Sequence, residues 1–417
     1  MKILITNYHC ASNRGDAAIM EGLISSLEDV FQSPEITIAT EFPEASSIIH
    51  DTRCIKQKTP FRAHEIKKNI ARLYSLFGAF VQKYGLNVPK FGKIIERMNL
   101  QPHLDSDLVI GTGGHYITDI YFPNKIGILW ELYFAKMLGK PVVLVAQSAG
   151  PFEDEKYKEI TRFVLNQIDI ITTRDEQTKE NLEKIGVTDT PIHFTADTAF
   201  FMDLKKKSSI ENNKFENIHI NDSDGLSISI SAREWPHIDR PEGQRKYVKS
   251  LSKVADWLIS KKEAEIRFIS TCTGFDGYHT DDRIIANRII ENMNNSDRAA
   301  ILYGEYTPQE LVNIYKEMDI HIGTRMHSNI LAILGGTPIV PIQYQFKTRG
   351  LAKQFDIEEY LISIDEITYE SLRENTKKAL SNKSKLERDL EAKVLEIKEN
   401  AKKNGELIHS MYNSTPN

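Results

Sequence analysis

Cysteine is scarce in this chain of 417 residues, which contains three: Cys10, Cys54 and Cys272. They lie far apart in the sequence, with no CxxC pair and no histidine at metal-ligand spacing. This pattern argues against a disulfide framework and against a cysteine-rich zinc site, and it favours a reducing compartment. We therefore expect a cytoplasmic protein with no metal site.

Long apolar runs are also absent. The most apolar region, residues 126–149, is interrupted by Glu131, Lys136 and Lys140, so no span of about 20 apolar residues occurs. The apolar run at residues 3–5 is too short for a signal peptide and is predicted to be a first β-strand. Any membrane contact is therefore expected to be peripheral, at the inner face of the membrane.

An excess of positive charge is missing as well. The chain has 53 Lys and Arg against 58 Asp and Glu, a net charge of −5. General nucleic-acid binding requires a basic face, so we expect no nucleic-acid partner. Neither a Walker A sequence nor a GxGxxG dinucleotide fingerprint occurs. The slight excess of negative charge over the whole chain still allows a local basic pocket for a small anion.

Short β-branched runs alternate with helical patterns, which is typical of parallel α/β sheets. The length exceeds what one hydrophobic core usually serves, so two domains are expected. The polar segment 203–225 is predicted to be the linker between them. We place one Rossmann-like domain at residues 1–205, a second at 225–365 and a helical tail at 366–417. Two possibilities stay open for the tail: it braces the first domain, or it is a solvated helix.

Each of the two domains is predicted to contain one series of parallel strands. Two such sheets joined by a linker predict a cleft at the carboxyl ends of their strands, where ligands of α/β sheets bind. The predicted strands are Ile3–Thr6, Ile36–Ala39, Leu108–Gly111, Val142–Ala146, Ile168–Thr172, Ile192–Thr195, Leu226–Ser231, Ile266–Ser270, Ala300–Tyr303, Ile320–Gly323, Ile339–Ile342 and Tyr360–Ile364.

Three arginines stand just past the carboxyl ends of predicted strands: Arg174, Arg233 and Arg325. An arginine at such a position is costly unless it is paired, and its planar guanidinium suits carboxylate or phosphate oxygens. Each one alone is better explained by an ion pair with a neighbouring acid such as Asp175 or Glu234. Three arginines in equivalent positions favour an anionic substrate.

His327 lies beside Arg325 at the start of a predicted helix. An imidazole next to a cation can serve as a proton donor or acceptor near neutral pH, and a plain helix cap is the other interpretation. Lys347 and Arg349 add two cations after a further strand. His321 lies within a strand and is interpreted as a core residue.

Two further segments follow strands of the first domain. Residues 13–16 lead into a helix whose free N–H groups could meet an anion or a sugar hydroxyl, and Asp16 alone is equally explained as a helix cap. Residues 111–114 contain three glycines, which let the backbone approach a ligand closely or form a tight turn.

Taken in order, these motifs resemble those of the polysaccharide pyruvyl transferase family. The resemblance covers roughly residues 1–350 and is more specific than any single motif. It implies a GT-B-like α/β fold, in which two Rossmann-like domains face each other across a cleft. The motifs that carry it are Asn13-Arg14-Gly15-Asp16, Gly111-Thr112-Gly113-Gly114 with Asp119, Gln147-Ser148-Ala149-Gly150-Pro151, Thr173-Arg174-Asp175 and Thr324-Arg325-Met326-His327.

The resemblance also implies a reaction. Phosphoenolpyruvate is the implied co-substrate, with no other cofactor, and its pyruvyl group forms a ketal across two hydroxyls of a sugar while phosphate leaves. The implied acceptor belongs to a surface polysaccharide or to its lipid-linked oligosaccharide precursor. His327 and Arg325 are the expected catalytic residues, and His327 is the acid that protonates the methylene carbon of the donor.

The remaining site residues are divided between donor and acceptor. The phosphate and carboxylate of the donor need several fixed cations. The expected donor-binding residues are Arg174, Arg233, Arg325, Lys347 and Arg349. The expected acceptor-binding residues are Asn13, Asp16, Gly113, Gly114 and Asp119.

Two other functions are compatible with this architecture. One is a nucleotide-sugar glycosyltransferase or epimerase of the GT-B type, which usually holds the ribose with a glutamate on the helix before a Gly-x-Pro turn. The predicted helix here, residues 328–334, contains no acid. The other is a catalytically silent sugar-binding or scaffold component of a polysaccharide assembly complex, and the pairing of Arg325 with His327 argues against it.

Overall fold

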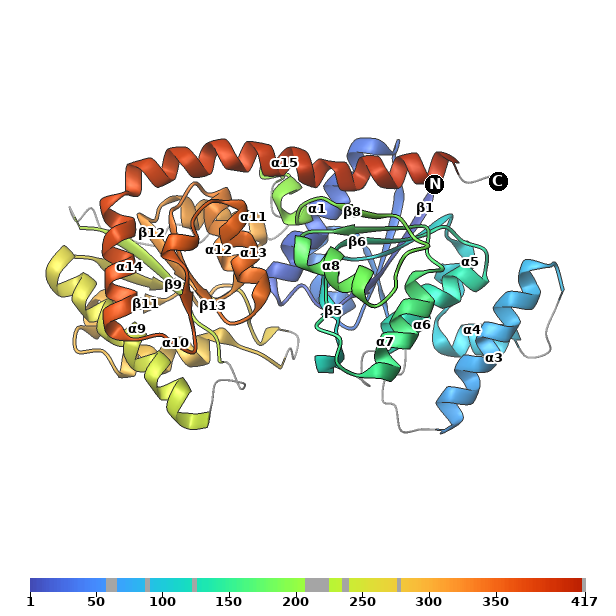
Figure 1. Ribbon diagram of the computed structural model, residues 1–417, viewed down its shortest axis with the longest axis horizontal. Helices are drawn as coiled ribbons and strands as arrows, with labels where there is room; N and C mark the ends of the chain where they lie inside the picture. Colours follow the sequence, from blue (N-terminus) through green and yellow to red (C-terminus); the bar gives the residue numbers. More distant parts are fainter. Residues whose placement is uncertain are drawn as a thin grey trace. The chain divides into compact units, whose positions relative to one another are not determined.

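The computed structural model describes residues 1–57, 66–86, 91–121, 126–206, 225–234, 240–275 and 279–414 (Figure 1). The chain divides into two compact units, the first made of residues 1–11, 19–202 and 398–417 and the second of residues 12–18 and 203–397. These units differ from the predicted ranges 1–205, 225–365 and 366–417. Residues 12–18 pack with the second unit although they lie near the start of the chain, and the tail is divided between the two units. Most of the predicted linker at 203–225 lies outside the described residues.

The first unit is built on a parallel sheet with strand order β3-β2-β1-β4-β6-β7-β8, and β5 pairs with β6. All strands predicted in this half are present. The sequence analysis missed β3, which carries charged residues at both ends, and β5, which begins with glycine. The strands are β1 (Lys2–Tyr8), β2 (Glu35–Thr40), β3 (Arg53–Lys56), β4 (Leu108–Gly111), β5 (Gly114–Ile117), β6 (Val142–Ala149), β7 (Ile170–Thr173) and β8 (Ile192–Phe194).

Helices connect the parallel strands of the first unit, as parallel pairing requires. The central strands β4 and β6 are buried along their whole length, so their apolar side chains form the core with those of α6. The helices are α1 (Arg14–Val30), α2 (Pro43–His50), α3 (Ile66–Lys83), α4 (Phe91–Met98), α5 (Gln101–Asp105), α6 (Ile126–Met137), α7 (Glu155–Leu165) and α8 (Glu176–Lys184), with the 3₁₀ turns η1 (Asp119–Tyr121) and η2 (Thr198–Phe201).

The second unit has its own parallel sheet, with strand order β11-β10-β9-β12-β13-β14. The carboxyl ends of β9, β12 and β13 therefore lie along one edge. Its elements are β9 (Ser227–Ser231), α9 (Arg240–Lys262), β10 (Glu265–Phe268), α10 (Asp282–Glu291), η5 (Ser296–Arg298), β11 (Ala299–Ile301), α11 (Pro308–Lys316), β12 (Ile320–Gly323), α12 (Met326–Leu334), β13 (Ile339–Gln343), α13 (Phe346–Gln354), η6 (Glu358–Tyr360), β14 (Ile362–Ser363) and α14 (Tyr369–Ser381).

Two helix starts show how local sequence sets these boundaries. At α11 the Thr307 hydroxyl accepts from the Glu310 N–H at 3.2 Å, and the Glu310 carboxylate accepts from the Thr307 N–H at 2.7 Å, a capping box. At α1 the cap is Asn13, whose side-chain oxygen accepts from the Gly15 N–H at 3.1 Å. Asp16 therefore lies within the first turn and does not cap this helix.

The tail forms one long helix, α15 (Lys383–Ser414), after α14. Of the two possibilities for the tail, packing against the first unit holds for residues from 398 onward. Asn404 is fully buried there, and its side-chain oxygen accepts from the hydroxyls of Thr172 at 2.6 Å and Thr195 at 2.9 Å. Within the described residues, no helix is long and apolar enough to cross a membrane.

Candidate functional site

Arg325 lies at the carboxyl edge of the second sheet, in the position just before α12. Its Nε and Nη2 donate to the two carboxylate oxygens of Asp282, the first residue of α10, at 2.9 Å and 2.6 Å. Burial disfavours the charged guanidinium, but the Asp282 carboxylate holds the pKa of Arg325 well above its usual value. Nη1 of Arg325 makes no hydrogen bond to any described residue, so this edge of the guanidinium is available to a ligand.

Tyr344, between β13 and α13, lies among three cations. The guanidinium carbon of Arg233 is 4.4 Å from the centre of the Tyr344 ring, and the Lys347 Nζ is 5.6 Å from it. Burial by itself would raise the pKa of the phenol. The charges of Lys347, Arg233 and Arg325, in that order, outweigh burial and lower the pKa of Tyr344 to about 8. We call Arg233, Arg325 and Lys347 the cation cluster.

His327 is the second residue of α12 and is half-buried. The backbone of Gly15 packs directly against its imidazole. A Cβ atom at Gly15 would lie 2.6 Å from Nδ1 of His327 and 2.7 Å from its Cβ. No side chain fits at Gly15 unless the imidazole moves, so this glycine sets the position of the ring.

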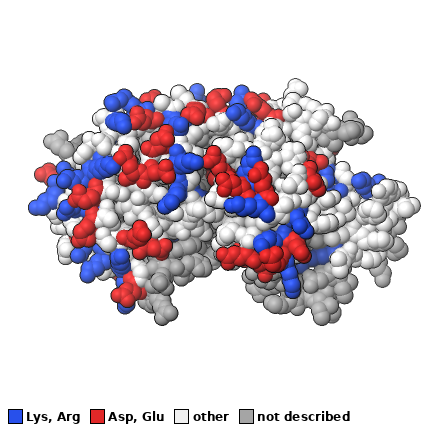
Figure 2. Space-filling view, in the orientation of Figure 1, with Lys and Arg blue, Asp and Glu red and all other residues white. Residues whose placement is uncertain are grey.

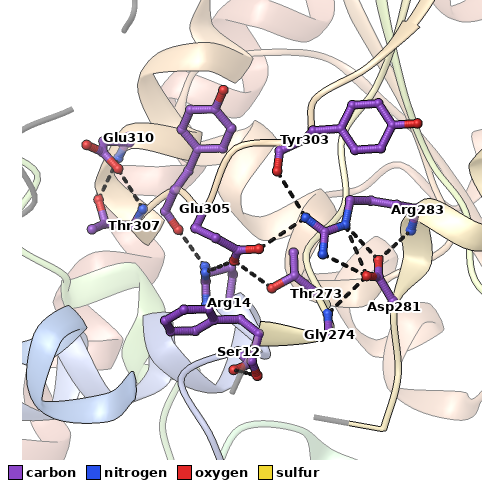
Figure 3. Close-up of polar contacts among 12 residues, drawn as sticks. Ser12, Arg14, Thr273, Gly274, Asp281, Arg283, Tyr303, Glu305, Thr307 and Glu310 are labelled. Carbon is purple, nitrogen blue, oxygen red and sulfur yellow. Dashed lines mark hydrogen bonds and ion pairs between the residues drawn. The ribbon is translucent and has the colours of Figure 1, made fainter. Parts of the chain in front are cut away.

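The segment Ser12–Ala18 holds Gly15 in that place through contacts within the second unit (Figure 3). Arg14 is 1% exposed, and its Nη2 donates to Glu305 at 2.6 Å while its Nε donates to the Tyr306 carbonyl. Its backbone N–H donates to the Thr271 carbonyl at 2.7 Å. Arg14 therefore fixes the segment through both its side chain and its backbone.

Glu305 is shared by several partners in this network. Its carboxylate accepts from the Thr273 hydroxyl at 2.7 Å and pairs with Arg283 at 3.1 Å, in addition to Arg14 (Figure 3). Arg283 in turn makes a bidentate pair with Asp281. Because each charge meets an opposite charge, the segment is held by a connected network and not by one contact.

Asn13 and Asp16, the predicted acceptor residues of this segment, thus belong by contact to the second unit. Asn13 forms an antiparallel bridge with Cys272, and Asp16 lies close enough to influence the pKa of that thiol. Burial, as the main cause, raises the pKa of Cys272 to about 12, so the thiol stays protonated. The structure brings Asn13 and Asp16 to the same unit as His327, and their acceptor role stays a prediction.

Arg174 belongs to the first unit and has a different environment. Its Nη1 donates to Asp197 at 2.7 Å and its Nε to the Ser148 hydroxyl at 2.8 Å, both in a buried setting. Asp175, the pairing partner considered from the sequence, instead accepts from Ser148 and caps α8 through the Thr178 N–H. Arg174 thus belongs to the first unit and the cation cluster to the second, and the donor role of Arg174 stays a prediction.

The other predicted acceptor residues lie in the first unit. A Cβ at Gly113 would lie 3.0 Å from the Ala146 carbonyl, and Gly114 begins β5 beside β6. Gly113 therefore allows close backbone packing on β6 within the short link between β4 and β5, and Gly114 begins a strand where a ligand-binding loop or tight turn was expected. Asp119 accepts hydrogen bonds from the backbone N–H groups of Glu153 and Asp154. Their acceptor roles remain predictions.

Arg349 is exposed on α13, and its Nε donates to Gln343 at 3.3 Å, so its donor role stays a prediction. His321 is fully buried, with one ring nitrogen 2.9 Å from the Ser229 hydroxyl and the other 3.0 Å from that of Ser328. Its complete burial confirms the interpretation of His321 as a core residue, and the same burial lowers the pKa of His321 to about 3.

Sequence reasoning missed three residues that shape the site: Asp282, Tyr344 and Arg14. Tyr344 directly follows a strand, as the arginines do, and that position was a usable signal. Arg14 stands in one of the family motifs, which was a signal for the residue but not for its partner, and Asp282 gave no signal, because its partner is distant in the sequence. Among the described residues, no group of three or more His, Cys, Asp or Glu side chains could hold a metal ion.

Comparison with solved structures shows the fold. The chain superposes over its whole length on a glycosyltransferase from Rickettsia africae ESF-5, with a TM-score of 0.62, 12% identity and 99% of that chain covered. It also superposes over its whole length on all of a UDP-GlcNAc 2-epimerase from Neisseria meningitidis, with a TM-score of 0.61 and 12% identity. These likenesses confirm the predicted GT-B-like fold of two Rossmann-like domains.

Comparison with known sequences is more specific than this structural likeness, which extends to the fold alone. The amylovoran biosynthesis protein AmsJ of Erwinia amylovora is 28% identical over 407 residues, which cover 94% of each chain. The family model for polysaccharide pyruvyl transferase matches residues 13–345, from the cap of α1 to the loop that carries Tyr344. This match includes most of the segment Ser12–Ala18, both Arg325 and His327, and most of the strands of both sheets. The chain belongs to the polysaccharide pyruvyl transferase family.

Proposed function

We propose that this protein transfers the pyruvyl group of phosphoenolpyruvate to a sugar of a surface polysaccharide or of its lipid-linked precursor. The product is a pyruvate ketal, and phosphate is released. The cation cluster binds the donor, and His327 supplies the proton. The reaction as proposed uses phosphoenolpyruvate as co-substrate and no other cofactor.

The observation that carries this proposal is the positive environment of Tyr344. The charges of Lys347, Arg233 and Arg325 lower the pKa of this phenol to about 8 in spite of burial, so the edge of the sheet favours negative charge. Phosphoenolpyruvate carries both a carboxylate and a phosphate, and charge-assisted hydrogen bonds from guanidinium groups suit both. A small polyanion therefore matches the cation cluster in charge and in donor geometry.

The proposed chemistry begins with a proton. His327 protonates the methylene carbon of the donor, and positive charge develops at the neighbouring carbon. One sugar hydroxyl attacks that carbon, and its proton returns to His327. A second hydroxyl of the same sugar then displaces phosphate, which leaves with the proton of that hydroxyl, and the ketal closes. Each step moves a proton or an electron pair between the donor, the acceptor and a side chain, so none requires a metal.

The alternative, a nucleotide-sugar glycosyltransferase or epimerase, finds no support in α12. This helix contains no carboxylate that could hold a ribose. The Asn329 side chain at its start donates instead to the Gly323 carbonyl at 3.0 Å. The structural likeness to such enzymes extends to the fold alone.

A binding and product experiment tests the proposal. Phosphoenolpyruvate at about 100 times its Kd should add about 2.7 kcal/mol to the free energy of unfolding, visible as a thermal shift. UDP-sugars at the same concentration should give no shift. Incubation with a lipid-linked or soluble oligosaccharide acceptor should release phosphate in step with ketal formation, measured by mass spectrometry. A shift with UDP-sugars alone would contradict the proposal.

The pKa of Tyr344 predicts a pH dependence. Below pH 8 the phenol is neutral, and above it the phenolate competes with the donor for the cation cluster. A group with a pKa of about 8 is roughly nine-tenths ionised at pH 9, so the Kd for phosphoenolpyruvate should rise about tenfold from pH 7 to pH 9. In Tyr344→Phe this rise should disappear. An identical rise in that variant, measured by isothermal titration, would assign the titration to another group.

A further inference from the structure

Helix α3 in the first unit is packed with its small residues inward. Ser75 and Ala79 are fully buried, and a Cβ at Gly78 would lie 2.1 Å from the ring of Phe91 on α4. These small residues let α3 pack closely on its neighbours α4 and α6. Tyr74, Leu76 and Val81 of α3 also pack on the apolar cluster that includes residues of α4 and α6, so the helix contacts the rest of the unit through small residues and partly buried apolar ones.

Large apolar side chains lie on the opposite face of α3 and just past its end. They are 46–69% exposed, and the ring centres of Phe80 and Tyr84 lie 5.3 Å apart. Spacings of three and four residues put side chains of a helix on one face. We call this set the α3 stripe: Leu73, Phe77, Phe80, Tyr84 and Leu86.

An ordinary surface helix exposes mainly polar residues, whereas α3 also exposes large apolar side chains on the face that points away from its neighbours. A contiguous exposed patch of this kind is typical of an interaction surface. In Figure 1, α3 and α4 lie at the margin of the first unit, beyond α6, and in Figure 2 the same margin shows mostly residues without charge.

The charge of α3 indicates what covers the stripe. The sequence of α3 contains basic residues and no acidic residue, and of its described basic side chains Lys83 is exposed beside the stripe while Arg72 is buried. A second copy of the chain placed on the stripe would bring two helices together that each lack an acidic residue. An anionic lipid surface complements the basic residues, and aromatic side chains next to basic ones are characteristic of helices that lie in the headgroup region.

We infer that the α3 stripe docks on the anionic surface of a lipid bilayer and inserts into the headgroup boundary without spanning the membrane. This inference is independent of the donor chemistry proposed above. It provides a physical route by which an enzyme without a membrane-spanning helix in its described residues meets an acceptor carried on a lipid.

Vesicle flotation tests the inference with the full chain. The vesicles are pure phosphatidylcholine, or phosphatidylcholine with about 30% phosphatidylglycerol, whose negative headgroups attract basic residues. The unmodified protein should float with the anionic vesicles only, and raised salt should weaken this binding. Phe77→Ser/Phe80→Ser should lower the bound fraction at least about tenfold, because both rings are exposed and lie in the proposed contact.

A matched control replaces two exposed apolar residues elsewhere. Phe163→Ser/Leu395→Ser should float like the unmodified protein, since these residues are 53% and 65% exposed on α7 and α15. All variants should keep the thermal shift with phosphoenolpyruvate, which separates this test from that of the donor site. Equal flotation with neutral vesicles, no flotation, or equal losses in both variants would overturn the inference. A dimer that only the Phe77→Ser/Phe80→Ser variant dissociates, without vesicle binding, would assign the stripe to a second copy.

Discussion

Replacing His327 by alanine is expected to lower kcat for pyruvyl transfer by about 10²–10⁴-fold, the usual contribution of a positioned general acid. The affinity for phosphoenolpyruvate should change little, because the cation cluster stays in place. The fold should also be retained, since the half-buried imidazole lies at the start of α12 and not in the core. Steady-state kinetics with phosphate release, together with donor titration, measures both quantities.

Gly15→Ala provides an independent test of the same role. Its added methyl group would lie 2.6 Å from Nδ1 of His327, so the imidazole must shift while every ionisable group of the site is kept. We expect kcat to fall in this variant as well, with donor affinity preserved. A Gly15→Ala or His327→Ala enzyme with near-normal turnover would remove the imidazole from the mechanism.

Arg325→Ala is expected to affect both binding and stability. A charge-assisted hydrogen bond to the donor contributes about 1.5–3 kcal/mol, so the Kd for phosphoenolpyruvate should rise roughly 10- to 150-fold. The same change leaves the Asp282 carboxylate buried without its bidentate partner. Breaking a buried ion pair in this way should lower the free energy of unfolding by about 3–5 kcal/mol.

The double variant Arg325→Ala/Asp282→Asn separates the two effects. Removing the uncompensated carboxylate should recover much of the stability, measured by urea unfolding, because the remaining amide carries no charge. Donor affinity should stay as low as in Arg325→Ala, since the guanidinium is still absent. Recovery of affinity together with stability would show that Arg325 acts only through the fold and does not contact the donor.

Most of the secondary structure was predictable because buried parallel strands are short, uninterrupted apolar runs. The predicted strands at residues 108–111 and 320–323 match β4 and β12 to the residue. The capping box before α11 was equally local, since its two partners lie three residues apart. By contrast, β3 is flanked by charges and only partly buried, so its sequence resembles that of a loop.

The candidate site was predictable in part. Arg325 and His327 stand next to each other in one motif, and the order of strands in the sheet brings Arg233 and Lys347 to the same edge. Arg174 has the same kind of position at the end of a strand, yet it belongs to the first unit and meets Asp197 there. A position at a strand end therefore locates an arginine on an edge of a sheet but does not say which acid it meets.

The sequence by itself determined the alternation of strands and helices, the two parallel sheets and the ordered motifs of the family, because each is encoded in neighbouring residues. Only the tertiary structure decided which charges meet. Asp282 pairs with Arg325 across 43 positions, and Glu305 pairs with Arg14 across 291. It also decided which apolar residues of α3 pack on the core and which form the exposed stripe. The physical reason is that pairing and burial depend on which segments pack together, and packing joins residues that the chain keeps far apart.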